Sequence, residues 1–176
     1  MRFCSSLCLL AGLASTVCAA TIDLSHAAVR IPQSFNGTGR KAVALLVEEV
    51  EKRSQVRWPV ENVASGTCVE MNITGNGRPA EGYRIETGGA GCAVKLTGND
   101  SRGLLYAAGR LLRELRIHPG SVVLPEPLNI TTAPHFAIRG HQLGYREANN
   151  TWDAWSAAQF EQYIRDLAVF GSNTIE

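Results

Sequence analysis

The segment PHFAIRGHQLGYR, from Pro134 to Arg146, is the stretch that decides how this chain is organised. It opens on a proline and continues through apolar residues that predict a buried strand over 136–143. Arg139 interrupts this apolar run, and a glycine follows it directly. The residues before the segment predict a self-contained unit, and those after it predict the first elements of another. We therefore place a domain boundary between residues 133 and 134.

Residues 1–20 predict a secretory signal peptide. They combine a basic start at Arg2, a short apolar run and small residues before Ala20, which is the layout of such a segment. The apolar run is much shorter than the roughly 20 residues of a membrane-spanning helix. A lipidated Cys18 is the weaker alternative, because the residues before it lack the leucine usual in a lipobox. We expect cleavage near residue 19 or 20, a secreted or periplasmic protein, and no membrane association afterwards.

The remaining chain is electrically neutral and has an ordinary globular composition. The full sequence of 176 residues is 45% hydrophobic and 19% charged. Without residues 1–20 it has 16 basic residues, which is the total of 17 less Arg2, against 16 acidic ones. A neutral chain has no electrostatic attraction to nucleic acid or to an anionic membrane. We therefore expect neither as a partner.

Two cysteines follow residue 20, and they allow a disulfide. Cys68 and Cys92 would be oxidised in a secretory compartment, although two free buried thiols are an equal alternative. Two cysteines are too few for a structural zinc site. The glycines of 88–91 lack the following helix that a phosphate-binding loop requires, so we interpret them as a hairpin turn. The sequence predicts no metal and no cofactor.

Residues 21–133 predict an α+β unit. Helical periodicity places one helix over 40–53 and a second over 102–116, each with an apolar stripe on one face. In the first helix, Glu48, Glu49 and Glu51 are expected to face solvent. Alternating or apolar runs predict strands at 27–31, 67–73, 82–87 and 92–96. Two helices on one face of an antiparallel or mixed sheet make a two-layer α+β sandwich.

Residues 134–176 predict one β-α-β unit. After the strand over 136–143, Ser156 and Gln159 form a capping box that begins a helix. Gly171 is suited to end this helix, and residues 172–176 predict a further strand. The stripe expected to be buried along the helix consists of Phe160, Ile164, Leu167 and Ala168. One β-α-β unit buries its faces only against further units.

Three parts of the sequence together resemble a known class of enzyme. Ser101–Ala107 (SRGLLYA), Pro134 and Phe136–Gly140 (FAIRG) resemble the N-terminal part of secreted glycoside hydrolases, most closely the family 20 β-hexosaminidases and the α-glucuronidases. The resemblance covers roughly residues 28–176. It implies a small α+β domain, residues 21–133, followed by the start of a truncated (β/α)8 barrel, residues 134–176. It also implies a carbohydrate substrate.

The same resemblance suggests substrate-binding residues. It implies that Arg139 hydrogen-bonds sugar hydroxyls, for which a planar guanidinium is well suited. The alternative is a structural ion pair with a carboxylate elsewhere in the barrel. His141, Tyr145 and Arg146 follow at or beyond the carboxyl end of the strand, where barrels place substrate groups. Gly144 stands where family 20 enzymes usually have an aspartate, which leaves an α-glucuronidase-like enzyme open.

We predict no catalytic residue within these 176 residues. Glycoside hydrolysis needs an acid together with a nucleophile or base, and the resemblance implies that these lie on later barrel strands. The chain is thus expected to be the N-terminal fragment of a secreted glycoside hydrolase, inactive without the remainder of the barrel. The alternative is a stand-alone carbohydrate-binding or structural module. Trp152 and Trp155 could stack on a sugar ring, although anchoring the adjacent loop and helix is the commoner use.

Overall fold

The computed structural model describes residues 21–35, 37–63, 66–75, 78–89, 91–142 and 154–176. The predicted signal peptide, residues 1–20, lies outside them. We call residues 21–133 the sandwich unit and residues 134–176 the C-terminal unit. The elements of the sandwich unit are β1 (Ile22–Asp23), β2 (Ala28–Arg30), α1 (Gly37–Ser54), β3 (Val60–Glu61), β4 (Cys68–Ile73), β5 (Tyr83–Thr87), β6 (Val94–Gly98), α2 (Ser101–Glu114), β7 (Arg116–His118), β8 (Ser121–Leu124) and β9 (Asn129–Thr132). Those of the C-terminal unit are β10 (Gly140–His141), α3 (Ala157–Val169) and β11 (Thr174–Ile175).

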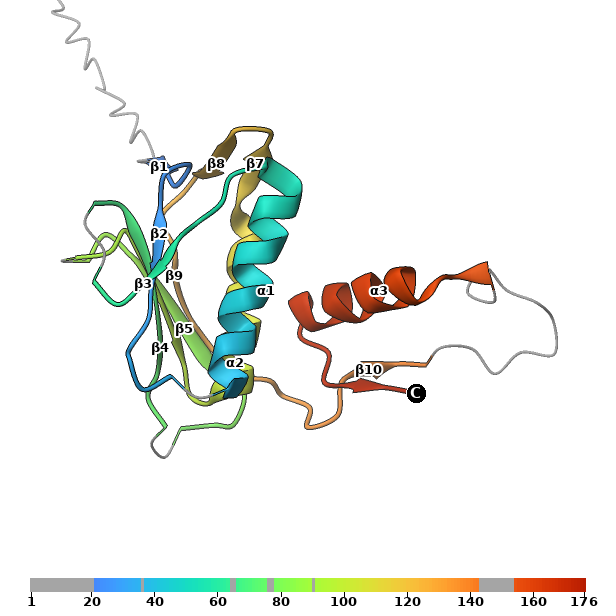
Figure 1. Ribbon diagram of the computed structural model, residues 1–176. Helices are drawn as coiled ribbons and strands as arrows, with labels where there is room; N and C mark the ends of the chain where they lie inside the picture. Colours follow the sequence, from blue (N-terminus) through green and yellow to red (C-terminus); the bar gives the residue numbers. More distant parts are fainter. Residues whose placement is uncertain (1–20, 36, 64–65, 76–77, 90, 143–153) are drawn as a thin grey trace, which may run out of the picture.

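The main sheet is mixed and has the strand order β3-β2-β4-β6-β5-β9. Strands β3, β2, β4 and β6 run parallel to one another, whereas β5 is antiparallel to both β6 and β9. Strands β5 and β6 are consecutive and antiparallel, with Thr87 paired to Val94, so they form the predicted hairpin. Helices α1 and α2 lie side by side on one face of this sheet (Figure 1). The prediction of a two-layer α+β sandwich is therefore confirmed.

The core lies between these two helices and the sheet. Helical periodicity puts Leu46 and Val50 of α1 and Leu111 of α2 on the faces that meet the sheet, and all three are fully buried. The sheet contributes alternate residues of its central strands to the same cluster: Val69, Met71, Ile85, Val94 and Leu96. Full burial of one such side chain stabilises the fold by about 1.5–3 kcal/mol.

Helix α2 is shorter than predicted because its last predicted residues join a second, small sheet. Asp100 caps the helix start, and its Oδ1 accepts a hydrogen bond from Gly103 N at 2.7 Å. The helix ends at Glu114, and Leu115 is already extended. Arg116 then pairs with Val123 of β8 in a hairpin. With β1 these strands form a three-stranded sheet in the order β1-β8-β7.

The C-terminal unit is the predicted β-α-β unit. Strands β10 and β11 pair in parallel, with Gly140 opposite Thr174, and α3 connects them. The capping box of Ser156 and Gln159 is present, and Gly171 ends α3 with a φ of 92°. The described residues form no closed barrel. No described helix is both long and apolar enough to cross a membrane.

Two predictions about burial in the C-terminal unit are wrong. In the described part of the strand expected over 136–143, residues 136–142, only Gly140 and His141 are in a strand, while Phe136 and Ile138 are 74% and 77% exposed. In α3, the expected stripe is not buried, and Ile164 is 46% exposed. Apolar periodicity shows which side chains share a face, but burial also needs an element that covers the face; α2 packs on α3 and leaves Leu167 and Ala168 half-buried. The buried residue of α3 is instead Val169.

Candidate functional site at the junction of the two units

Arg139 lies at the junction of the two units, directly before β10. Its backbone is held by Asn173, the residue that precedes β11. Arg139 N donates to Asn173 Oδ1 at 2.9 Å, and Asn173 N donates to the carbonyl oxygen of Arg139 at 2.7 Å. These bonds align the two strands at their amino ends. Arg139 is thus at the end of β10 opposite to the carboxyl end, where barrels place their substrate groups.

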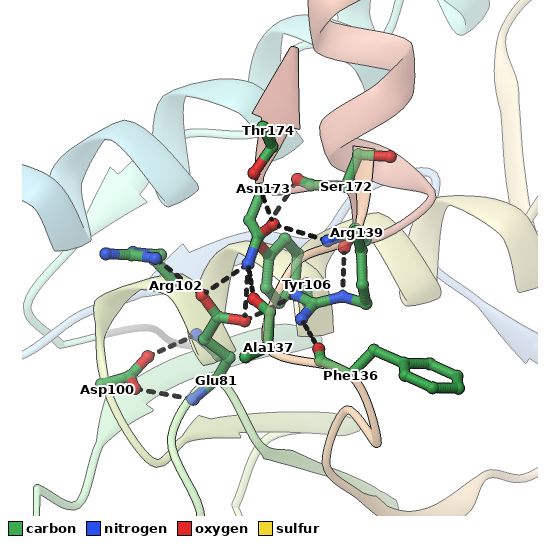
Figure 2. Close-up of polar contacts among 12 residues, drawn as sticks. Glu81, Asp100, Arg102, Tyr106, Phe136, Ala137, Arg139, Ser172, Asn173 and Thr174 are labelled. Atoms are coloured by element: carbon green, nitrogen blue, oxygen red, sulfur yellow. Dashed lines mark hydrogen bonds and ion pairs between the residues drawn. The ribbon is translucent and has the colours of Figure 1, made fainter. Parts of the chain in front are cut away.

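The side chain of Arg139 is engaged at all three of its nitrogen atoms (Figure 2). Its Nε donates to Gly171 O at 2.9 Å, and Nη1 donates to Phe136 O at 2.7 Å. Its Nη2 forms an ion pair with Glu81 Oε2 at 2.6 Å. The guanidinium also lies over the ring of Tyr106, 5.3 Å from its centre. The described contacts of Arg139 therefore tie the C-terminal unit to the sandwich unit.

Glu81, in the turn before β5, is the acceptor at the centre of this junction. Its carboxylate receives Arg102 Nη1 at 2.7 Å from α2, in addition to Arg139 and the side-chain amide of Asn173. Its own N–H donates to Asp100 Oδ2 at 2.7 Å, which fixes its backbone at a φ of 60°. Burial alone would raise the pKa of Glu81, but hydrogen bonds from Arg139, Asn173 and Arg102 outweigh it and lower the pKa. The carboxylate is therefore ionised at neutral pH.

Tyr106 of α2 completes the junction. Its hydroxyl donates to the carbonyl oxygen of Ser172 at 3.3 Å, so a sandwich-unit side chain also holds the segment between α3 and β11. Burial raises the pKa of Tyr106, which keeps the hydroxyl protonated at neutral pH. Beside it lies a cavity of about 220 Å³, lined in part by Tyr83, Arg113 and Phe170. This is smaller than most ligand pockets, which are roughly 300–1,000 Å³.

A second polar contact between the units centres on Glu49 of α1. The prediction that Glu49 faces solvent is wrong, because only 1% of this residue is exposed. Arg53 Nη2 donates to its carboxylate at 2.9 Å, and Arg165 Nε and Gln162 Nε2 of α3 donate at 3.2 and 3.3 Å. Burial alone would raise the pKa of Glu49, but these donors outweigh it and lower the pKa. Arg165 also pairs with Glu48.

Periodicity could not identify Glu49 as a contact residue, because its partner on α3 is 116 positions away. In sequence, Glu49 belongs to a run of glutamates that is typical of a solvated helix face. The sequence also contained no pattern that marks Glu81 as a contact residue, since Glu81 lies in a turn outside any predicted element. Both carboxylates acquire their partners through tertiary structure.

Of the predicted substrate-binding residues, the structure describes Arg139, at this junction, and His141. His141 is in β10, with its Nδ1 2.7 Å from the hydroxyl of Tyr163 and the two rings edge to face. Tyr145 and Arg146 lie outside the described residues. A sugar contact of Arg139 stays an untested prediction. Its described contacts are those of the alternative, a structural ion pair, with a carboxylate from the sandwich unit in place of one from the barrel.

Trp155 packs against its own helix. Its ring meets Phe160 and Tyr163 edge to face, with centres 5.4 and 5.3 Å apart. These contacts anchor the start of α3, which is the commoner of the two uses considered for this residue. Trp152 lies outside the described residues.

The two cysteines form a disulfide within the sandwich unit. Cys68 at the start of β4 and Cys92 before β6 are joined across a sequence separation of 24 residues, with an S–S distance of 1.99 Å. Among the described residues, no group of three or more His, Cys, Asp or Glu side chains could hold a metal ion. The disulfide therefore accounts for both cysteines that follow residue 20.

Comparison with known proteins identifies the fold. No protein-family model matches the sequence, and no curated protein is significantly similar to it in sequence. The structure is similar to a GH20 β-N-acetylhexosaminidase from Streptomyces coelicolor, with a TM-score of 0.69 and 19% identity over 89% of this chain and 31% of that one. A GH20 exo-β-N-acetylglucosaminidase from Vibrio harveyi, in complex with N-acetylglucosamine, gives 0.66 and 23% over 88% of this chain and 22% of that one.

A mutant (D313A) β-hexosaminidase from Streptomyces plicatus, in complex with the product GlcNAc, is similar as well, with a TM-score of 0.67 and 21% identity over 89% of this chain and 31% of that one. The chain thus spans between about a fifth and a third of the length of these solved structures. The matched part includes most of the sandwich unit and of the C-terminal unit together, because it covers nearly nine-tenths of the chain. This chain has the fold of the N-terminal region of GH20 β-hexosaminidases.

Proposed function

We propose that this chain is the N-terminal region of a glycoside hydrolase, with the sandwich unit as its accessory domain and residue 134 as the start of its catalytic barrel. The observation that carries the proposal is the similarity of both units, in one arrangement, to GH20 enzymes over 88–89% of the chain. The substrate class is an oligo- or polysaccharide. Sugars with terminal N-acetylglucosamine are the first candidates, since two similar structures hold that sugar.

The open faces of the C-terminal unit support the idea that further barrel strands complete it. Phe136 and Ile138 are largely exposed, and Ile175 of β11 is 37% exposed. In an all-parallel barrel such strand residues are covered on both faces. The described residues of the junction form ion pairs and hydrogen bonds between the two units, so they are suited to holding the units together. We therefore assign the chemistry to the completed barrel.

His141, Tyr145 and Arg146 are our proposed substrate-binding residues. His141 is in β10, and the other two follow it on the carboxyl side of that strand. In (β/α)8 enzymes, residues at that end of a strand contact substrate. Arg139 is at the opposite end, so its proposed role is to hold the two units together.

The test is to determine the coding sequence beyond codon 176 and to express the whole reading frame. We expect further β-α repeats with paired acidic residues, and hydrolysis of aryl N-acetyl-β-glucosaminides by the whole protein. An aryl α-glucuronide would be assayed beside them, because the sequence also resembles α-glucuronidases. A stop codon directly after codon 176, together with a stable and soluble product, would contradict the proposal and favour a stand-alone module.

We also propose that the protein is exported and loses residues 1–20. The signal-like sequence of these residues and the disulfide between Cys68 and Cys92 support export to an oxidising compartment. Mass spectrometry of the protein from its native source tests this. A mature protein that begins near residue 20 is expected, and one that retains Met1–Ala20 and reduced thiols would contradict it.

A further inference from the structure

The C-terminal unit has almost no core of its own. Its helix α3 has 13 residues, and Val169 is the one that is buried. An isolated helix of this length is marginal in water. Strands β10 and β11 contribute two residues each, all of them exposed. What orders this unit must therefore come from outside it.

Val169 is buried against a glycine of the sandwich unit. Gly109 in α2 lies so close to α3 that a Cβ atom added to it would be 2.5 Å from Val169 O and 2.7 Å from Val169 Cα. The two helices meet at this point backbone to backbone, which any larger residue prevents. The contact fixes the last turn of α3 on α2.

Two carboxylates of the sandwich unit hold the same unit at other points. Glu49 on α1 receives Arg165 and Gln162 from the middle of α3. Glu81 receives Arg139 and Asn173, which flank the starts of β10 and β11. Figure 1 shows α3 beside the two sandwich helices, and Figure 2 shows the Glu81 contacts. The sandwich unit therefore contacts the C-terminal unit at three points. One is the close backbone contact at Gly109, and the other two are the buried carboxylates of Glu49 and Glu81.

We infer that the sandwich unit is the folding template of the first barrel unit, and that Glu49, Gly109 and Glu81 form the template face. The C-terminal unit is ordered because it docks on this face, with no need for neighbouring barrel strands. The face fits a helix that presents an arginine and a glutamine to Glu49 and a closely approaching backbone to Gly109. This inference concerns order and docking, so it does not depend on which sugar the whole protein cleaves.

Hydrogen exchange of backbone amides, followed by mass spectrometry on the 176-residue chain, tests the inference. We expect the amides of α3 to exchange at least about tenfold more slowly than those of an unstructured peptide. In Gly109→Ala, α3 should lose this protection, while β4 and β6 keep theirs. Gly37→Ala is the matched control, because a Cβ at this helical glycine has nothing within 4 Å and should leave α3 unchanged.

Two results of this experiment would overturn the inference. One is exchange of α3 at peptide rates in the unmodified chain, and the other is unchanged protection of α3 in Gly109→Ala. If Gly109→Ala also lowers the protection of β4 and β6, the variant has disturbed the sandwich unit itself. Arg165→Ala then tests the inference, because Arg165 lies on α3 outside the sandwich core. A fall of roughly 5- to 30-fold in the protection of α3 alone is expected for Arg165→Ala. Unchanged protection in this second variant would equally reject the template.

Discussion

Glu81 is the carboxylate at the centre of the junction of the two units. It accepts from two arginines and an asparagine, and only 11% of its side chain is exposed. Its backbone has a φ of 60°, a conformation that costs a non-glycine residue about 1 kcal/mol or more. This cost is offset because the same turn places the carboxylate against Arg139 and the backbone N–H against Asp100.

Glu81→Gln tests the strength of this contact. The substitution keeps the shape and removes the charge, so the three donors lose their charge-assisted acceptor. We expect the free energy of unfolding to fall by about 1–3 kcal/mol, measured by urea denaturation. Glu86→Gln is the matched control, because Glu86 is 44% exposed and pairs with Arg84 at 3.8 Å. That change should stay within about 0.5 kcal/mol. Equal effects of the two substitutions on the free energy of unfolding would mean that the Glu81 contacts stabilise the fold no more than an exposed ion pair does.

The stabilising contribution of the Glu81 carboxylate is also expected to depend on pH. The pKa of Glu81 is lower in the folded protein than in the unfolded chain, where it is about 4.3. Its ionised form therefore stabilises the fold above pH 4.3, and this contribution is lost as the pH falls through the folded-state value. We expect the stability difference between the original protein and Glu81→Gln to be full at pH 7 and to vanish in acid. Urea denaturation from pH 7 to pH 2.5 measures it, and a difference independent of pH would contradict the assignment.

At the scale of elements, α2 lies close to the residue that precedes β5. A Cβ on Gly103 would be 2.1 Å from the carbonyl oxygen of Gly82, which is backbone and cannot rotate away. Gly103→Ala should therefore force α2 from the sheet and destabilise the protein by about 1–3 kcal/mol. Gly89→Ala serves as control, since nothing lies within 4 Å of its Cβ. Thermal unfolding of both variants, followed by circular dichroism, decides, and equal melting temperatures would contradict the expectation.

Local signals in the sequence were sufficient to predict the three helices. The apolar stripe containing Leu46 and Val50 indicates α1, although the helix extends to 37–54 in place of the predicted 40–53. Asp100 and Ser156 indicate two helix starts, because a capping side chain acts within three residues. Such features depend on neighbours in the chain, so one sequence suffices to find them.

Features that depend on distant partners could not be predicted in the same way. An alternating strand pattern does not say which strand lies beside it, so the parallel pairing of β4 with β6 remained open. The apolar run at Phe136 and Ile138 indicated burial, but burial requires a covering element. In the candidate site, Arg139 was predicted as a sugar contact, and that contact stays a prediction. Its partner Glu81 is 58 residues earlier, and no local pattern connects the two.

For the whole molecule, the disulfide is the one covalent constraint described besides the backbone itself. It closes a loop of 24 residues, which restricts the unfolded chain and stabilises the fold by about 3 kcal/mol. The double substitution Cys68→Ser and Cys92→Ser should therefore lower the free energy of unfolding by about this amount. The reduced original protein is the matched comparison and should lose a similar amount. If neither loses stability under urea denaturation, the bridge does not form in solution.

The parallel pairing of β10 with β11 has a consequence for the order of synthesis. Arg139 and Asn173, which align the two strands, are 34 residues apart in the chain. At roughly 5–20 residues per second, a ribosome needs about 2–7 seconds to produce the second after the first. Throughout that interval the sandwich unit has been synthesised in full, and Glu81 has already emerged. Glu81, the carboxylate that receives both Arg139 and Asn173, is therefore already part of the chain before the second strand of the pair is made.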